Sequence, residues 1–280
     1  MIKGIDVSHH QEAIQWTNAK AAGIEFAMIK VTEGVGYTDP NFKDYASGAS
    51  AAGLHIGAYH FLRAGDAQKQ AGEFLTAIKP YKWDYPLACD VEHAELLQLK
   101  KANLTDMVIA FCEVIKHAGY YPMIYSNLDW CKNYLDMNRL KAYDLWFARY
   151  NEVPGYGGVS IWQHSNTGQI AGISGNVDLD LSYKDYPAII KAGGYNGFVK
   201  PRAFTCDTSG TVEIAADGVY TAKTTGNVQL VAGTANVVRV VRCLQNGYVL
   251  WHIVPVGNAG QTVGIYPMGD SIKLFTVKIK

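Results

Sequence analysis

Two carboxylic acids stand two residues apart in the segment Cys89-Asp90-Val91-Glu92. If this segment is a β-strand, alternation places Asp90 and Glu92 on one face, with Cα atoms about 6.6 Å apart. Cys89 and Val91 then point into the opposite layer. Two carboxylates this close cannot both ionise easily, so one pKa rises and that group becomes a general acid near neutral pH. Cleavage of a glycosidic bond needs such an acid for the leaving oxygen and a second carboxylate at the anomeric carbon.

Other chemistries have weaker support. A metal site needs ligands on a common face, but no His-x-His or His-x-x-x-His pair is present, and His9 and His10 point opposite ways if extended. We therefore interpret His60 as a hydrogen-bonded barrel histidine, and His9 and His10 as loop residues. The chain has no Gly-x-Ser-x-Gly motif, and residues 34–36 lack the lysine of a phosphate loop. The sequence predicts no metal and no cofactor.

The hydrophobic pattern predicts the elements that would position the acids. Strand-like apolar segments alternate with segments of helical periodicity up to Tyr143, which indicates parallel strands joined by crossover helices. The strands are expected at 2–7, 26–31, 54–61, 87–91 and 123–125, and the helices at 13–22, 42–52, 67–78, 104–117 and 130–140. After Tyr143 the helices are expected to stop, and three further strands follow at 145–148, 159–163 and 177–181. The fold class is α/β, an incomplete (β/α) barrel of eight strands.

Polar residues stand where these strands end. In a barrel of parallel strands the active site lies at the carboxyl ends, because the loops that open there carry the functional groups. The residues at these positions are Asp6, Lys30 with Thr32 and Glu33, Tyr59 with His60, Asp90 with Glu92, Tyr125 with Ser126, Arg149, Gln163, and Asp178 with Asp180. Tyr59, Tyr125, Trp146 and Trp162 add apolar surfaces suited to sugar rings. The alternative is that these polar groups only cap helices and face water.

Composition changes near residue 200. Ten valines occur up to residue 204 and thirteen after it, which predicts a β-rich second domain at 205–280, joined to a first domain at 1–192 by a Gly- and Pro-containing linker at 193–204. Its strands are expected at 211–214, 219–222, 228–231, 237–243, 248–254 and 272–279, forming a small all-β sandwich or barrel. Four aromatic residues there could stack on a sugar or fill the core: Tyr220, Tyr248, Trp251 and Tyr266.

The charge balance excludes some partners. The 280 residues carry 25 basic and 25 acidic side chains, so nothing attracts the chain as a whole to nucleic acid or to an anionic membrane. No apolar run is long enough to span a membrane. The segment before residue 201 holds 18 basic and 21 acidic residues and the rest holds 7 and 4, so the halves differ in sign. Five dispersed cysteines and the absence of a signal-peptide pattern predict reduced thiols and synthesis in a cytoplasm.

Residues 1–190 resemble glycoside hydrolase family 25, the N-acetylmuramidase type of lysozyme found in phage endolysins. The resemblance rests on short motifs in the same order along the chain. They are Gly4-Ile5-Asp6-Val7-Ser8, the run 23–34, Asp39-Pro40-Asn41-Phe42, Gly57-Ala58-Tyr59-His60-Phe61, Asp90-Val91-Glu92, Leu145-Trp146-Phe147-Ala148-Arg149-Tyr150, Ile161-Trp162-Gln163 and Val177-Asp178.

The resemblance implies a flattened barrel of five βα units followed by three strands, and cleavage of the β-1,4 bond between N-acetylmuramic acid and N-acetylglucosamine in peptidoglycan. It implies that Glu92 is the general acid and Asp90 its partner, with Asp6 and Asp178 as further pocket acids. Asp180 stands where the family usually carries Asn, so it either shifts neighbouring pKa values or faces outward. Substrate assistance, direct carboxylate attack and water-mediated inversion all remain open mechanisms.

Three hypotheses follow for the whole chain. The leading one is a modular endolysin whose second domain binds the cell wall, and which waits in the host bacterial cytoplasm until a holin opens the membrane. Its partner is peptidoglycan, and its substrate contacts are expected from Tyr59, Tyr125, Trp146, Arg149, Gln163, Lys30, Glu33 and Asp180. A catalytically inactive glycan-binding barrel is the second. The third is a muramidase whose second domain forms a homo-oligomer through exposed strand edges.

Overall fold

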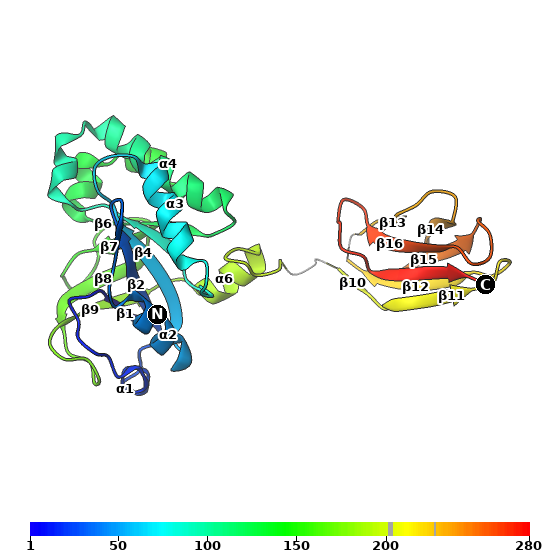
Figure 1. Cartoon of the computed structure of the whole chain (residues 1–280), viewed down its shortest axis with the longest axis horizontal. Helices are drawn as coiled ribbons and strands as arrows, with labels where there is room; N and C mark the ends of the chain where they lie inside the picture. The colour runs from blue at the N-terminus through cyan, green and yellow to red at the C-terminus, as the bar shows by residue number, and fades with distance from the viewer. Residues whose placement is uncertain (201–203, 227) are drawn as a thin grey trace. The chain divides into compact units, whose positions relative to one another are not determined.

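The computed structural model describes residues 1–200, 204–226 and 228–280, and the chain divides into two compact units, Met1–Pro201 and Arg202–Lys280 (Figure 1). We call them the barrel unit and the sandwich unit. Most of the segment expected as a linker, 193–204, falls within the barrel unit, and residues 201–203 of that segment lie outside the described residues. Among the described residues, no helix is long and apolar enough to cross a membrane.

The barrel unit is a closed sheet. Around the barrel the strands run in the order β1, β9, β8, β7, β6, β5, β4, β2, and pairing of β1 with β2 closes it. A short strand, β3 (Tyr37–Thr38), extends β2 as a hairpin. The eight barrel strands are β1 (Ile2–Val7), β2 (Phe26–Glu33), β4 (His55–Phe61), β5 (Leu87–Asp90), β6 (Pro122–Asn127), β7 (Asp144–Ala148), β8 (Val159–Gly168) and β9 (Val177–Ser182). The predicted incomplete (β/α) barrel is confirmed.

Helices occupy the outside of the first half of the barrel. In Figure 1, α3 and α4 lie side by side over one flank of the strands. The helical segments are α1 (Trp16–Ala21), α2 (Phe42–Ala51), α3 (Ala67–Ile78), the 3₁₀ turn η1 (Ala94–Gln98), α4 (Lys101–His117), the π-helical turn η2 (Trp130–Tyr134) and α5 (Met137–Leu140). The single helix expected at 130–140 is interrupted at Leu135, whose backbone is extended, and Asp136 caps the short helix that follows.

One further helix, α6 (Tyr186–Gly193), contradicts the expectation that helices stop after Tyr143. Asp185 accepts a hydrogen bond from the backbone N–H of Ala188, and Pro187 stands in the first turn. Gly194 ends the helix at a φ of 72°. An Asp cap, an early proline and a terminal glycine are the usual signals of a helix start and end, so this helix was detectable in the sequence.

Strand alternation separates two apolar layers. Outward residues such as Ile5, Cys89 and Val91 pack against the helices, and inward residues such as Phe26 and Met28 fill the barrel. The predicted outward direction of Cys89 and Val91 is thereby confirmed.

Aromatic rings close one end of the interior. Phe26 stacks on Tyr85 with ring centroids 4.4 Å apart, and Tyr85 meets Tyr186 of α6 at 5.4 Å. A side chain at Gly4 would collide with the Phe26 ring, because a Cβ there would lie 2.3 Å from it. Since this end is filled by rings, the polar interior groups gather at the opposite, open end.

The residues after α6 remain attached to the barrel through Asn196. Its side-chain amide donates to the backbone carbonyls of Trp83 and Tyr85, at 2.9 and 3.0 Å, and its Oδ1 accepts from the N–H of Tyr121 at 2.8 Å. Asn196 has a φ of 54°, a left-handed conformation that asparagine tolerates better than most residues. These bonds explain why the barrel unit continues beyond residue 193.

The sandwich unit consists of two four-stranded sheets, ordered β10-β12-β15-β14 and β11-β17-β16-β13. The strands are β10 (Thr205–Cys206), β11 (Gly210–Ile214), β12 (Tyr220–Thr225), β13 (Leu230–Ala232), β14 (Val238–Gln245), β15 (Tyr248–Pro255), β16 (Thr262–Pro267) and β17 (Phe275–Ile279). The expected all-β character is confirmed. The strands β10 and β16 were not predicted. Asn246 and Gly247 turn the β14–β15 hairpin with positive φ values of 52° and 81°.

Trp251 belongs to the core of the sandwich. It is 2% exposed, and its indole N–H donates to the Thr224 hydroxyl at 2.8 Å. Of the two alternatives for Trp251, a sugar contact or a place in the core, the structure therefore supports the core. Tyr220 also contributes to the core, where it packs near Phe275. Tyr248, by contrast, is 51% exposed.

Candidate active site

The acids expected at the strand ends meet at the open end of the barrel. Asp6 and Asp90 come from the carboxyl ends of the parallel strands β1 and β5. Asp178 reaches the same end by a different route, because β9 runs antiparallel to β1 and begins where β1 ends, with Asp178 paired to Asp6. We expected 177–181 as one more parallel strand of the barrel. Asp178 does lie at this end of the barrel, but near the start of an antiparallel strand.

Gln163 links one of these acids to two tyrosines. Its side-chain N–H donates to Asp6 Oδ2 at 2.7 Å, and its Oε1 accepts from the hydroxyls of Tyr125 and Tyr150 at 3.0 and 3.1 Å. Gln163 is 3% exposed, which gives it a supporting position between the acid and the tyrosines. Tyr150 was not among the predicted site residues. Tyr150 is the last residue of the 145–150 motif, two positions after the expected strand 145–148, and this position was the available signal.

Asp180 points into the barrel, so of the two expectations for this residue, the one that it faces outward is wrong. It is 1% exposed, and Oδ1 accepts from the indole N–H of Trp146 at 2.7 Å. Its Oδ2 is buried with no hydrogen-bond partner among the described residues. Burial, together with the nearby Asp178 carboxylate, raises the pKa of Asp180 to about 8. Asp180 is therefore a largely neutral acid at pH 7.

Trp146 supports the site from within. It is 1% exposed, and its ring contacts Tyr125 and Tyr59 at centroid distances of 4.5 and 5.8 Å. This burial corrects the expectation of a sugar platform at Trp146. Tyr59 and Tyr125 are also buried, at 8% and 5% exposure, and burial with the surrounding acids keeps the pKa of both hydroxyls well above the usual value.

Asp90 and Glu92 differ in how deeply they lie. Asp90 is 5% exposed and its Oδ1 has no hydrogen-bond partner in the described part of the chain, whereas Glu92 is half-buried just beyond the end of β5. Burial is the main cause that raises both pKa values, Glu92 further raises that of Asp90, and Asp178 further raises that of Glu92. The expectation that only one member of the pair has a raised pKa is too simple.

Asp6 shares this behaviour, since burial and then the neighbours Asp180 and Asp178 raise its pKa well above the usual value, against the opposing hydrogen bond from Gln163. Because the carboxyl groups interact, protons leave the group as a whole and not one residue at a time. Burial is the largest cause of the raised pKa throughout this cluster of carboxyl groups.

Lys30 brings a positive charge to the cluster. It lies on β2, its side chain is 8% exposed, and its ammonium lowers the pKa values of both Asp90 and Glu92. The ammonium bonds to Glu33 Oε2 at 2.7 Å, and Glu33 also binds Arg63. Although burial opposes it, these bonds lower the pKa of Glu33 overall. We expected Lys30 and Glu33 to bind substrate, but in the structure they form an ion pair with each other.

Arg149 does not join the acids. Its guanidinium donates to the backbone carbonyl of Pro154 at 2.8 Å, and a side chain at Gly155 would collide with it. This contact braces the loop that follows β7. The expectation that Arg149 binds substrate is therefore not supported by its position.

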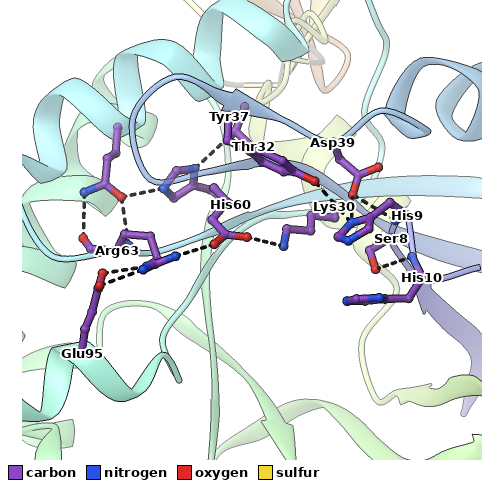
Figure 2. A network of polar contacts seen from close by, with 12 residues as sticks. Ser8, His9, His10, Lys30, Thr32, Tyr37, Asp39, His60, Arg63 and Glu95 are labelled. Carbon is purple, nitrogen blue, oxygen red and sulfur yellow. Dashed lines mark hydrogen bonds and ion pairs between the residues drawn. The ribbon is translucent and has the colours of Figure 1, made fainter.

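A polar cavity of about 640 Å³ lies beside Glu33. Its lining residues are His9, Glu33, Gly34, Val35, Tyr37, Arg63, Ala64 and Glu95. His9, expected as an ordinary loop residue, is held by the buried Asp39, which accepts from its backbone N–H at 3.0 Å and lies 2.9 Å from its Nδ1 (Figure 2).

His60 is a structural histidine, as predicted. It sits between the Thr32 hydroxyl and Gln70 Oε1 at 2.7 and 2.9 Å, and its ring stacks on Phe111. Burial lowers its pKa to about 4. Within the described ranges, no group of three or more His, Cys, Asp or Glu side chains is arranged to hold a metal ion.

A closed barrel with paired carboxyl groups at the carboxyl ends of its strands is the architecture expected of a glycoside hydrolase. The family model "Glycosyl hydrolases family 25" matches residues 5–173, and the chain belongs to this family. The autolytic lysozyme of Clostridium acetobutylicum is 35% identical over 184 residues, covering 64% of this chain and 55% of that protein.

A phage protein and a crystal structure are similar over the same region. The D-alanyl-L-alanine endopeptidase of Streptococcus phage B30 is 32% identical over 208 residues, covering 67% of this chain and 45% of that protein. The crystal structure of the bacterial lysozyme from Streptomyces coelicolor has a TM-score of 0.61 and 28% identity, and covers 71% of this chain and 98% of its own. The chain spans about half the length of the two curated relatives.

Proposed function

We propose that the barrel unit hydrolyses peptidoglycan at the β-1,4 bond between N-acetylmuramic acid and N-acetylglucosamine. The observation that carries this proposal is the cluster of carboxyl groups with raised pKa values at the open barrel end: Asp90, Glu92, Asp6 and Asp178. Family membership supports the reaction class. The choice of bond follows from the resemblance to muramidases.

In this proposal Glu92 is the general acid. It is the more accessible member of the pair, and its raised pKa keeps a proton available for the leaving oxygen near neutral pH. That oxygen takes the Glu92 proton as the glycosidic bond breaks, and water then supplies a hydroxyl to the anomeric carbon and a proton back to Glu92.

Asp90 is buried more deeply than Glu92, and its carboxylate stabilises the positive charge that develops at the anomeric carbon. Its unpartnered Oδ1 provides an acceptor that can hold the substrate acetamide or attack directly. Both of these routes retain the anomeric configuration, and attack by water inverts it, so NMR of the first product anomer separates inversion from the other two.

Mass spectrometry of peptidoglycan digests tests the assignment. We expect new reducing ends on muramic acid, and reducing ends on glucosamine would contradict the bond specificity. If the wild-type chain binds the polymer but releases no new ends, the alternative of a catalytically inactive glycan-binding barrel replaces this proposal.

We further propose that the sandwich unit binds the bacterial cell wall through the outer face of the sheet β10-β12-β15-β14. Because Ala222 and Trp251 fill the core, strand alternation turns Lys223 of β12 to the outer face. Its ammonium lies 3.3 Å from the centroid of the exposed Tyr248 ring. Arg239 of β14 is exposed on the same sheet, where it pairs with Val254, six residues along β15 from Tyr248. A face with an aromatic ring beside one cation and a second cation further along the sheet suits an extended anionic glycan polymer.

The two outer faces of the sandwich differ in charge pairing. On the second sheet Glu213 binds Lys278 and Lys280 at 3.4 and 2.6 Å, so those two cations share one carboxylate. In the described part of the unit, Lys223 and Arg239 form no comparable ion pair. This difference supports the choice of the first sheet as the binding face.

For the biological setting we propose a phage or prophage endolysin that stays in the host cytoplasm until a holin opens the membrane. The similarity to a protein of Streptococcus phage B30 supports this setting. Fractionation of an expressing host before and after membrane permeabilisation tests it, because lysis should begin only after permeabilisation.

Oligomerisation through the sandwich unit is the competing proposal for this part of the chain. Strand β14 is at the end of its sheet, so its outer edge is available for pairing with a second copy. Analytical ultracentrifugation of the full chain tests it, and a monomer at micromolar concentration would exclude it.

A further inference from the structure

Arg63 joins the ends of three barrel strands. Its Nη1 bonds to Glu33 Oε1 at 2.7 Å, and its Nε and Nη2 bond to the two carboxylate oxygens of Glu95 at 2.6 and 2.8 Å. Glu33 ends β2, Arg63 follows β4, and Glu95 lies in the turn after β5. Figure 2 shows this chain of contacts running from Lys30 through Arg63 to Glu95.

The backbone of Arg63 is fixed as well. Gln70 accepts from its N–H at 3.1 Å and donates to its carbonyl at 2.8 Å, and the N–H of Ala64 binds Glu95 at 2.7 Å. The guanidinium of Arg63 bonds two carboxylates, and the backbone N–H and carbonyl of the same residue are also hydrogen-bonded, so Arg63 has little freedom to move. The arrangement is therefore rigid from the loop after β4 to the Lys30 ammonium.

We propose that Arg63 is a positioning residue for the acid pair: it fixes Glu33, and through Glu33 it fixes the Lys30 ammonium, whose positive charge acts on Asp90 and Glu92. This inference rests on the proposed function only for its activity readout. Arg63 itself bonds to neither acid, so its effect passes through Glu33 and Lys30.

The charge on Arg63 matters because Glu33 is shared. Lys30 and Arg63 carry two positive charges and their partners Glu33 and Glu95 carry two negative ones, so the four groups together are neutral. Without Arg63, the three remaining groups carry one net negative charge near the acid pair. The charged and titratable groups that interact with the pair from the surrounding elements are Lys30, Glu33, Tyr59, Tyr125, Tyr150 and Asp178.

The test is the pH–activity profile of Arg63→Gln. In the proposed mechanism, activity needs an ionised Asp90 and a protonated Glu92, so the profile is bell-shaped. Because loss of a positive charge raises both pKa values, the acidic and the alkaline limb of this profile should both move to higher pH by about half a unit or more. Glu33→Gln should do the opposite, because it leaves Lys30 without its carboxylate and both limbs then move to lower pH.

Opposite shifts distinguish an electrostatic role from a structural one. If Arg63 only stabilised the loop, both variants would lose activity with an unmoved profile, and that result would overturn the proposal. Arg63→Lys keeps the charge but not the fork, so its profile should return toward that of the wild type.

Arg139→Gln is the matched control. It removes another arginine–carboxylate contact, from Arg139 Nη2 to Asp106 Oδ1 at 2.6 Å, between α5 and α4. The pH–activity profile of Arg139→Gln should match that of the wild type.

A readout without activity separates this inference from the proposed function. The carboxyl carbon of Glu92, followed by ¹³C NMR during a pH titration, should report a raised pKa in Arg63→Gln and a lowered one in Glu33→Gln. If the wild type releases no reducing ends but these shifts occur, the proposed function fails and the positioning role stands. If the titration of Glu92 is the same in the wild type and both variants, the positioning role is wrong.

Discussion

In the barrel unit the functional charges lie inside the sheet, whereas in the sandwich unit the charges lie outside it. Asp6, Asp90 and Asp180 are each at most 6% exposed, and their neighbours are strands and aromatic rings. Among the described residues of the sandwich, the buried side chains are apolar apart from Thr208 and Thr224, while Arg239 and Glu213 face water. Similar strands thus place charges in two environments: burial in the barrel unit changes pKa values, and exposure in the sandwich unit leaves the charges in contact with water.

The largest effect should come from Glu92→Gln. Gln has the shape of Glu but no proton to transfer, so turbidity clearing of susceptible walls should fall by at least about 10²-fold. Binding to those walls should stay normal, since the outer face of the sandwich is unchanged. Circular dichroism controls for folding, and near-normal lysis would remove Glu92 from the role of general acid.

Asp90→Asn should also abolish most turnover, by about 10²-fold or more, because Asn cannot carry the negative charge that supports the anomeric carbon. This variant should gain thermal stability, since it removes a buried acid whose ionisation is unfavourable. Differential scanning calorimetry measures the gain at pH 7. Lower stability together with lower activity would mean that Asp90 is chiefly a structural residue.

The next effect concerns stability and pH at Asp180. Its pKa is about 8 in the fold, against about 4 in an unfolded chain. Between these values the unfolded state has lost the proton that the folded state keeps, so the contribution of Asp180 to stability falls as pH rises from about 4 to 8. Asp180→Asn keeps an oxygen for the Trp146 indole and should raise the Tm at pH 7.5 by several degrees, but change it little at pH 4.5. Equal shifts at both pH values would contradict the buried-acid account.

A smaller effect is expected on the outer face of the sandwich. In the Glu92→Gln background, the pair of changes Arg239→Gln and Tyr248→Ala should weaken sedimentation with purified walls about tenfold, a loss of about 1.4 kcal/mol. The matched control is Lys278→Gln, which alters the opposite sheet. Wall binding that depends on Lys278 and not on Arg239 would reverse the assignment of the two faces.

The sequence predicted the two-unit division, the barrel and the acids more readily than the contacts among them. Alternation along β5 determines the direction of Asp90, because period two is a local property, whereas Glu92 lies beyond the end of this strand. The antiparallel direction of β9 is not local: it depends on how strand 177–182 returns between β1 and β8. For the same reason the sequence could not show that Gln163 bonds to Asp6, 157 residues away.

Other errors came from treating exposure as a property of residue type. Trp146 was expected to offer its ring to a sugar, and for Trp251 a sugar contact was one of two alternatives, yet both rings are buried and donate their N–H groups to buried oxygens. A tryptophan in a strand is oriented by its neighbours on both faces, and the pattern alone does not identify the buried face. Arg63 was missed because its partners Glu33 and Glu95 are each about thirty residues away.

Tyr150 sharpens the contrast between the two units, because it is part of the barrel yet is 53% exposed. Its hydroxyl is one of two donors to Gln163 Oε1, so Tyr150→Phe leaves the Tyr125 bond in place and should cost about 0.5–1.5 kcal/mol, or two- to tenfold in kcat/KM. If the ring binds a sugar as the sandwich face is proposed to do, Tyr150→Ala should raise KM while kcat stays close to that of Tyr150→Phe. If instead Tyr150 acts only by holding Gln163 against Asp6, both variants should lower kcat equally and leave KM unchanged. Steady-state kinetics on soluble peptidoglycan fragments therefore decides whether the rim of the barrel behaves as a binding surface or as part of the buried chemistry.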